Sequence, residues 1–142
     1  MKRVIGLLLA SGILLVGCAS GPKLSETQSK LPSLPEDQGR IYFYRTSIMG
    51  MAIQPGIALN GKTVGSCAPN GVFFVDVPPG NYEASITTEV ERKLNFTVDK
   101  GEEKFVRCYI SMGFFVGHGI VELVDPTTGR DETRDLAFTG KQ

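Results

Sequence analysis

The sequence predicts a small antiparallel β-sandwich of about seven strands, preceded by a signal peptide and a flexible tether. Three observations predict this fold. From Gly39 onward, apolar residues recur at every second position, which is the period of a half-buried strand. The 17 glycines and 8 prolines suit a chain with many turns. The 142 residues suffice for one domain with a single core, and no segment has a clear amphipathic helical period or repeats another.

The N-terminus has the three parts of a secretory signal. Lys2 and Arg3 form a cationic start, and residues 4–16 form an apolar run that ends at the small residue Gly17. A run of about a dozen apolar residues is shorter than the roughly 20 that a membrane-spanning helix needs. The sequence therefore predicts export and cleavage of this leader.

The exit of the leader, residues 15–18, reads Leu-Val-Gly-Cys and resembles the lipobox of bacterial lipoproteins. The resemblance implies that Cys18 is alkylated with diacylglycerol, that the chain is cut before it, and that its amine receives a further acyl chain such as palmitate. Residue 19 is Ala rather than Asp, so the inner-membrane retention signal of enterobacterial lipoproteins is missing. The implied location is the outer membrane, facing the periplasm. The alternative is an ordinary signal peptide or hydrophobic anchor with a chance cysteine.

Three segments follow from these signals: a cleaved signal peptide (1–17), a lipidated N-terminus with a flexible linker (18–38), and the β-sandwich (39–142). The linker is polar and contains several prolines, which predicts a tether that reaches about 65 Å at full extension. The alternative is that Leu31 and Leu34 fix part of it to the domain.

The domain divides into segments with strand character, separated by turn residues. Asn60-Gly61 suits a two-residue hairpin turn because both residues tolerate a positive φ. Pro78-Pro79-Gly80, residues 99–102 and residues 125–129 are further expected turns. The expected strand segments are 40–45, 57–59, 62–64, 72–77, 82–89, 93–99, 105–112, 120–124 and a short one at 136–138.

Four runs of the domain carry a family resemblance: 39–45, 59–65, 73–82 and 106–107. Together they resemble an uncharacterised family of bacterial lipoprotein domains, a domain of unknown function. Residues 77–82 (Val-Pro-Pro-Gly-Asn-Tyr) also resemble the turn of PEGA-type surface modules, which are small β-sandwiches. The resemblance spans roughly residues 39–138 and implies a fold and an envelope location. It brings no catalytic residues.

Two cysteines remain in the domain once Cys18 is lipidated. In an oxidising periplasm, Cys67 and Cys108 would pair as a disulfide if the fold brings them together. The alternative is two separate buried thiols. Cys108 is expected to share a strand face with Val106 and Ile110.

Little else in the sequence suggests chemistry. His118 is the single histidine, so we expect a loop residue exposed to solvent rather than a base or a metal ligand. Asp76 lies in an apolar strand, where it is expected to be a paired polar group beside a turn. Fifteen basic residues balance fifteen acidic ones, and the mature chain has a charge of about −2, so nucleic acid is not an expected partner. We expect no cofactor, no metal and no enzymatic activity.

Two apolar, glycine-flanked stretches remain for interaction. They would form one contact patch for a protein, a lipid or a ligand if both reach the same end of the sandwich. The alternative is that they extend strands and close the core. The patch residues are Ile48, Met49, Met51, Phe114, Phe115 and Val116.

The sequence thus predicts a membrane-anchored envelope lipoprotein whose domain is a non-enzymatic interaction or structural module. Its expected partners are membrane lipid, through the acylated N-terminus, and envelope proteins or the cell wall. The alternative is a periplasmic module that binds a small ligand or a glycan.

Overall fold

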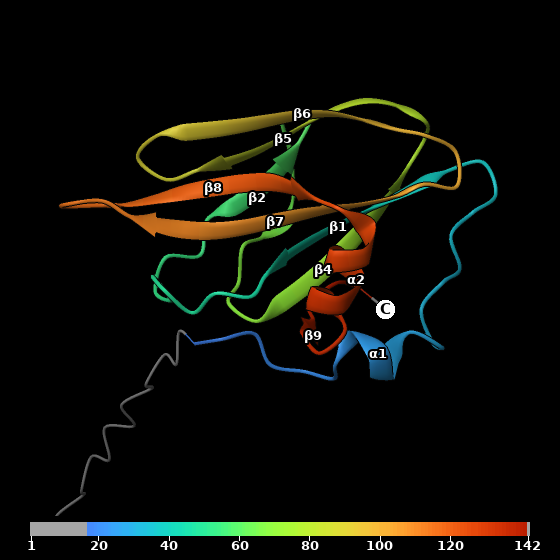
Figure 1. Cartoon of the computed structure of the whole chain (residues 1–142), viewed down its shortest axis with the longest axis horizontal. Coiled ribbons are helices and arrows are strands. Elements are labelled where there is room, and N and C mark those ends of the chain that lie inside the picture. Colours follow the sequence, from blue (N-terminus) through green and yellow to red (C-terminus); the bar gives the residue numbers. More distant parts are fainter. Residues whose placement is uncertain (1–16, 142) are drawn as a thin grey trace, which may run out of the picture.

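The computed structural model describes residues 17–141, and within them the fold is a sandwich of two β-sheets (Figure 1). The five-stranded sheet has the order β8-β7-β1-β4-β9, and the four-stranded sheet has the order β3-β2-β5-β6. The strands are β1 (Gly39–Arg45), β2 (Gly56–Leu59), β3 (Lys62–Ser66), β4 (Gly71–Val77), β5 (Gly80–Thr87), β6 (Glu91–Val98), β7 (Glu103–Met112), β8 (Gly117–Val124) and β9 (Ala137–Phe138). Two short helices accompany them, α1 (Leu24–Thr27) and α2 (Pro126–Thr133).

The main core lies between the sheets and consists of the inward faces that the two-residue period predicted. Ile41 and Phe43 of β1 face Ala84 and Ile86 of the opposite sheet, and all four are completely buried. The same cluster contains Ile57, Leu59, Cys67, Phe73, Val77, Phe96, Val98, Val106, Cys108 and Val121. The predicted β-sandwich is therefore confirmed.

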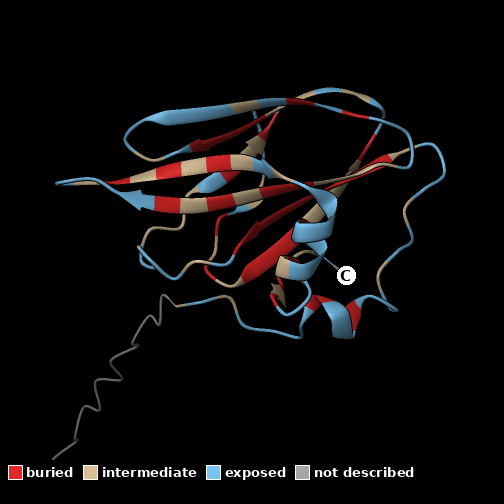
Figure 2. Cartoon of the chain, in the orientation of Figure 1, coloured by how far each residue is buried: buried red, intermediate tan, exposed pale blue. Residues whose placement is uncertain are grey.

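A second apolar cluster covers the outer face of the five-stranded sheet. The outward residues of β1, Tyr42 and Tyr44, lie there with Phe105, whose ring stacks on Tyr42 at 4.7 Å between centroids. Leu24, Leu136 and Phe138 cover these side chains from α1 and from the C-terminal segment. Because both of its faces are covered, β1 is buried at all seven positions (Figure 2).

Two features of the sheets differ from the prediction. All nine expected strand segments form strands, which is more than the count of about seven, and the sandwich is not purely antiparallel. β1 pairs with β7 in parallel, and β4 pairs with β9 in parallel. Neither pair is joined by a tight turn, and apolar alternation alone does not give the relative direction of strands that lie far apart in sequence.

The hairpin turn predicted at Asn60-Gly61 is present. Both residues have positive φ, 49° and 80°, as a type I′ turn requires, and they join β2 to β3.

Helix α2 replaces the turn that was expected at residues 125–129. Asp125 caps the helix by accepting a hydrogen bond from Thr128 N at 3.0 Å, and Pro126 occupies the first turn, where its missing N–H costs nothing. The buried residues of this helix are Gly129 and Thr133. Because α2 has no apolar stripe, its sequence lacks the 3.6-residue hydrophobic period that predicts an amphipathic helix.

Parts of the linker are bound to the domain, so the linker is not the flexible tether that the sequence predicted. Leu24 N donates to Leu136 O at 2.9 Å, and Phe138 N donates to Pro22 O at 2.9 Å. The Leu24 side chain is 7% exposed, Leu31 packs against the second cluster, and Leu34 is half-buried. Burial of Leu24 in the second apolar cluster holds this segment on the domain, although most of its residues are polar. The signal peptide, apart from Gly17, lies outside the described residues.

Candidate functional surface beside Cys18

One end of the sandwich gathers the residues that the sequence singled out. The turn between β7 and β8, the loop between β1 and β2, and the start of the described chain all lie at the left end in Figure 1. The strand register agrees with this placement, because β7 pairs in parallel with β1 up to Tyr44↔Arg107, and the rest of β7 continues past the end of β1 toward the same side.

Arg45, the last residue of β1, holds the loop at residues 46–55 in place. Its side chain is completely buried, and its guanidinium donates to four backbone carbonyl oxygens. These are Ser47 O at 2.9 Å, Met49 O at 2.6 Å, Ile53 O at 2.9 Å and Cys67 O at 2.9 Å. Burial lowers the pKa of Arg45. The alternating pattern gave no sign of this role, because Arg45 looked like the polar end of a strand.

Glycines allow this loop to lie directly on the β7–β8 hairpin. Gly50 has φ +66°, and a Cβ there would lie 2.9 Å from Cγ2 of Ile110. A Cβ on Gly117 would lie 2.8 Å from Cδ1 of Ile53. Larger residues at either position would push the loop away from the hairpin.

The apolar side chains of the two segments point into solvent. Phe114 is 100% exposed and Phe115 is 95% exposed, while Val116 is half-buried. Met112 is exposed as well, and it lines one recess together with Met49. We call the exposed set the apolar end: Ile48, Met49, Met51, Met112, Phe114 and Phe115. These side chains do not close the core, which was the alternative left open by the sequence.

Cys18 lies at this same end, with an exposed thiol. The residues on either side of it are hydrogen-bonded to the domain. Gln54 Nε2 donates to Gly17 O at 2.9 Å, and Ala19 N donates to Pro69 O at 2.7 Å. The predicted acylation position therefore has no free linker between it and the domain.

Cys67 and Cys108 are joined in a disulfide whose Cα atoms are 6.1 Å apart. Both residues are 1% exposed and belong to the core between the sheets. The bridge links the segment after β3 to β7 and lies under the loop that Arg45 holds, since Arg45 also binds Cys67 O. Of the two alternatives that the sequence left open, the structure has the disulfide.

Charged residues are sparse at this end of the molecule. Residues 46–56, 66–72 and 110–119, which build this end, contain no Asp, Glu, Lys or Arg. Glu89, in the β5–β6 turn, is an acidic residue close to the apolar end, since it lines a recess with Ile53 and Phe115. Arg107 lines the recess of Met49 and Met112, but it is paired with Glu122 and Glu132, so its charge is already neutralised and attracts phosphate groups only weakly.

His118 was expected in an exposed loop, but it lies in β8 and pairs with Ser111 of β7. It is half-buried, and its Nδ1 atom has no hydrogen-bond partner. The strand begins three residues earlier than the apolar pattern indicated, because Gly117 and Gly119 accept close contacts from isoleucine side chains opposite them. A glycine in a strand hides the two-residue period.

Asp76 is the paired polar group that the sequence predicted. It faces Arg40 across the β1–β4 ladder and accepts two hydrogen bonds, Nε to Oδ1 at 2.6 Å and Nη2 to Oδ2 at 2.9 Å. The hydrogen bond to Asp76 raises the pKa of Arg40. The Arg40 guanidinium also lies 3.8 Å from the centroid of the Phe74 ring. This pair stabilises the sheet and uses both oxygens of the Asp76 carboxylate.

A second ionic network attaches α2 to the five-stranded sheet. Arg107 of β7 binds Glu122 of β8 and Glu132 of α2, each at 2.7 Å. The Tyr44 hydroxyl also donates to Glu132, and burial raises the pKa of Tyr44, with that hydrogen bond as the second cause. The charges of Arg107, Glu122 and Glu132 are therefore paired within this network.

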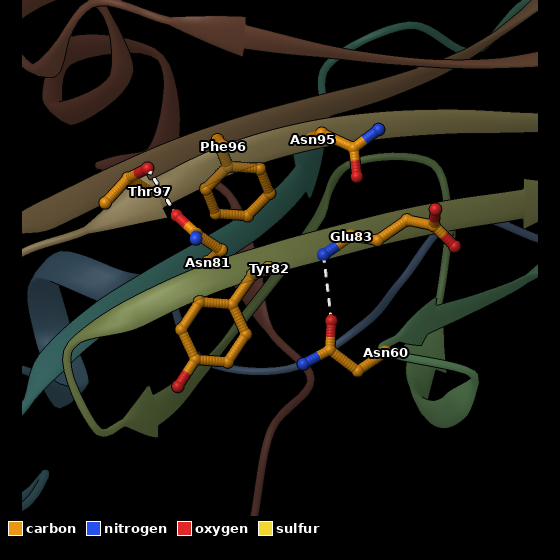
Figure 3. A pocket seen from close by; sticks show the side chains of 7 residues that line it. All are labelled: Asn60, Asn81, Tyr82, Glu83, Asn95, Phe96 and Thr97. Carbon is orange, nitrogen blue, oxygen red and sulfur yellow. Dashed lines mark hydrogen bonds between the residues drawn. The ribbon is translucent and has the colours of Figure 1, made fainter.

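A polar pocket lies on the four-stranded sheet, away from the apolar end (Figure 3). Asn60 Oδ1 accepts from Glu83 N at 2.9 Å, and Asn81 Oδ1 accepts from the Thr97 hydroxyl at 2.8 Å. Because both amide oxygens are used, the two NH₂ groups are left to meet a ligand. The lining residues are Asn60, Asn81, Tyr82, Glu83, Asn95, Phe96 and Thr97.

Residues 17–141 contain neither a cluster of metal-ligating side chains nor a helix that could span a membrane. No group of three or more His, Cys, Asp or Glu side chains is arranged to hold a metal ion in this part of the chain. Neither helix there has the length and apolar character that crossing a membrane would require.

Comparisons with known proteins place the domain in a family. Residues 35–120 match the family described as "Protein of unknown function (DUF2846)". An uncharacterized protein of Haemophilus influenzae is 27% identical over 128 residues, covering 87% of this chain and 76% of the relative. The N-terminal domain of AlgF from P. aeruginosa aligns with 63% of this chain and with 99% of its own length, at 15% identity and a TM-score of 0.43. The expected family of unknown function is thus confirmed, and the likeness to PEGA-type modules stays a prediction.

Proposed function

The chain belongs to the DUF2846 family of proteins of unknown function, and we propose that it is a lipoprotein of the bacterial envelope, anchored through acylated Cys18 in the outer membrane and facing the periplasm. Its β-sandwich serves as a non-enzymatic module for structure or interaction. The observation that carries the proposal is the lipobox Leu-Val-Gly-Cys at the end of a tripartite leader. The exposed Cys18 thiol at the surface of the domain is compatible with it.

Two further observations support a module without catalysis. The carboxylates of the five-stranded sheet and of Glu132 in α2 are paired with arginines: Asp76 with Arg40, Glu103 with Arg130, and Glu122 and Glu132 with Arg107. His118 has no acid–base partner beside it among the contacts of the described chain. A general acid–base pair or an activated nucleophile needs such neighbours.

The test is the Cys18→Ser variant expressed with its own leader. We expect wild-type protein in the membrane pellet, with acyl mass on the N-terminal peptide that begins at Cys18. The variant should lose the acyl mass and leave the pellet. The proposal fails if the variant is still processed at the same site and still sediments with membranes. Crosslinking of the native protein in cells should then recover envelope neighbours, and repeated failure to capture any would count against an interaction role.

A second candidate function is binding of a small ligand or glycan, and the pocket of Figure 3 is the observation that favours it. Amide side chains beside aromatic rings suit the hydroxyl groups and apolar faces of a sugar. Addition of cell-wall fragments should then raise the melting temperature of the wild-type protein. Asn95→Ala should abolish that increase, because this side chain lines the pocket and lies outside the two hydrogen bonds described there. An equal increase in the variant would exclude this pocket.

A further inference from the structure

We propose that the apolar end is a second membrane contact, and that its side chains enter the same lipid leaflet that holds the acyl chains of Cys18. The inference rests on the proposed acylation of Cys18 for the identity of that leaflet. It adds a definite orientation: the domain does not hang from a tether but sits on the bilayer through the turn of the β7–β8 hairpin and the loop at residues 46–55.

The position of Cys18 supports this orientation. In the uncleaved chain, Gln54 Nε2 donates to Gly17 O, which places Cys18 beside the loop at residues 46–55. Cleavage before Cys18 removes that bond, but Ala19 N still donates to Pro69 O of the domain at 2.7 Å. Gln54 belongs to the same loop as Ile48, Met49 and Met51. With no slack between Cys18 and the domain, lipid on this residue would bring the bilayer to the end of the sandwich where these side chains are exposed.

The hairpin turn has the chemistry of a group that enters a bilayer. Phe114 and Phe115 are adjacent, almost completely exposed, and 6.4 Å apart between ring centroids. One backbone hydrogen bond closes the turn beside them, from Gly113 N to Val116 O at 2.9 Å. Two exposed phenyl rings gain free energy when they leave water for the apolar part of a bilayer.

The distribution of charge favours lipid over a polar partner and specifies which lipid is needed. The segments that build this end, 17–22, 46–56, 66–72 and 110–119, lack Lys, Arg, Asp and Glu. Glu89 lies beside the recess that Phe115 lines. The contact therefore depends on apolar insertion, and vesicles of zwitterionic phosphatidylcholine suffice. Anionic lipid should not strengthen it.

The chain has no tryptophan, so a single introduced indole reports its own environment. The experiment uses the full mature lipoprotein with the substitution Phe115→Trp, reconstituted in phosphatidylcholine vesicles. We expect its emission to shift to shorter wavelength, to be quenched by brominated lipid, and to be protected from iodide. The matched control is Leu123→Trp. Leu123 is also exposed, but it lies six residues along β8 from Gly117, about 20 Å from the turn. Its indole should stay accessible to iodide.

The possible results distinguish a failure of the second membrane contact from a failure of the proposed acylation of Cys18. If the vesicle-bound lipoprotein carries acyl chains and the F115W indole is still quenched by iodide as in solution, the second contact is wrong while the anchor stands. If mass analysis finds no acyl chain, the proposed acylation of Cys18 is wrong. Quenching of the F115W indole in the presence of added phosphatidylcholine vesicles then tests the membrane contact of the apolar end independently of acylation. Protection of F115W in cell envelopes but not in pure vesicles would assign the surface to a protein partner and overturn the proposal.

Discussion

The guanidinium of Arg45 donates to the carbonyl oxygen of Cys67 at 2.9 Å, and so joins the end of β1 to the segment that carries the buried disulfide. The other three acceptors of Arg45 lie in the loop at residues 46–55. One buried cation therefore fixes the loop that carries half of the apolar end, with backbone carbonyls rather than a carboxylate as its partners.

Replacing Arg45 should destabilise both the fold and this loop. Arg45→Met removes donors from four buried or half-buried carbonyl oxygens, and we expect a loss of about 3 kcal/mol in the free energy of unfolding. Arg45→Lys should recover only part of it, because an ammonium group lacks the planar fork that reaches all four acceptors. Urea unfolding measures the loss, and limited proteolysis should cut within residues 46–55. Arg92→Met, at an exposed position of β6, is the control and should be near neutral.

Removing the disulfide should cost about 4 kcal/mol, the chain-entropy value for a loop of 41 residues. The measurement is urea unfolding of the Cys67→Ala/Cys108→Ala variant. Because both cysteines are 1% exposed, reductant without denaturant should leave the bridge intact. Alkylation followed by mass analysis should then add one label at Cys18 in an unacylated sample. Three labels under native conditions would show that this end of the sandwich opens readily, contrary to its burial.

The sequence predicted the sandwich because its inner faces follow a simple rule. Residues of β5 and β6 alternate between core and solvent, so Ala84, Ile86, Phe96 and Val98 could be assigned from their spacing alone. The turn at Asn60-Gly61 was equally direct, since few residue pairs tolerate two positive φ values. Local chemistry decided these features.

The features that the sequence did not give depend on contacts between distant segments. Leu24 looked like an isolated apolar residue in a polar linker, but Leu136 and Phe138, more than a hundred positions away, bury it. The parallel pairing of β1 with β7 has the same origin. For the candidate surface, the residues were predictable but their arrangement was not, because the position of the loop depends on Arg45.

Gly129 is a helix residue at which alanine should destabilise the protein. On an exposed helix, Gly→Ala gains about 1 kcal/mol from helix propensity. Here a new Cβ would overlap the Phe105 ring and lie 2.6 Å from Cδ1 of that residue. Because overpacking costs about 1–3 kcal/mol, the steric cost should match or exceed the gain. Urea unfolding should show a net loss for Gly129→Ala and a change within about 0.5 kcal/mol for Thr127→Ala, at an exposed position of the same helix. A more stable Gly129→Ala protein would mean that α2 does not pack on Phe105 as described.

Asp125 should make the stability of α2 depend on pH. Hydrogen bonds from the Thr128 hydroxyl and then from its backbone N–H lower the pKa of Asp125 below its ordinary value of 3.8. A carboxyl group whose pKa is lower in the folded state stabilises the fold above its unfolded-state pKa, and this contribution is lost as the pH falls through the folded-state value. Asp125→Ala should therefore be less stable than wild type at pH 7, by a difference that shrinks in acid. Asp125→Asn keeps a capping oxygen without a titrating proton, so its difference from Asp125→Ala should stay constant with pH. Urea unfolding of the three proteins at pH 7, 5 and 3 measures both differences in the free energy of unfolding. If the difference between wild type and Asp125→Ala stayed the same from pH 7 to below the folded-state pKa, a charged cap at Asp125 would be excluded.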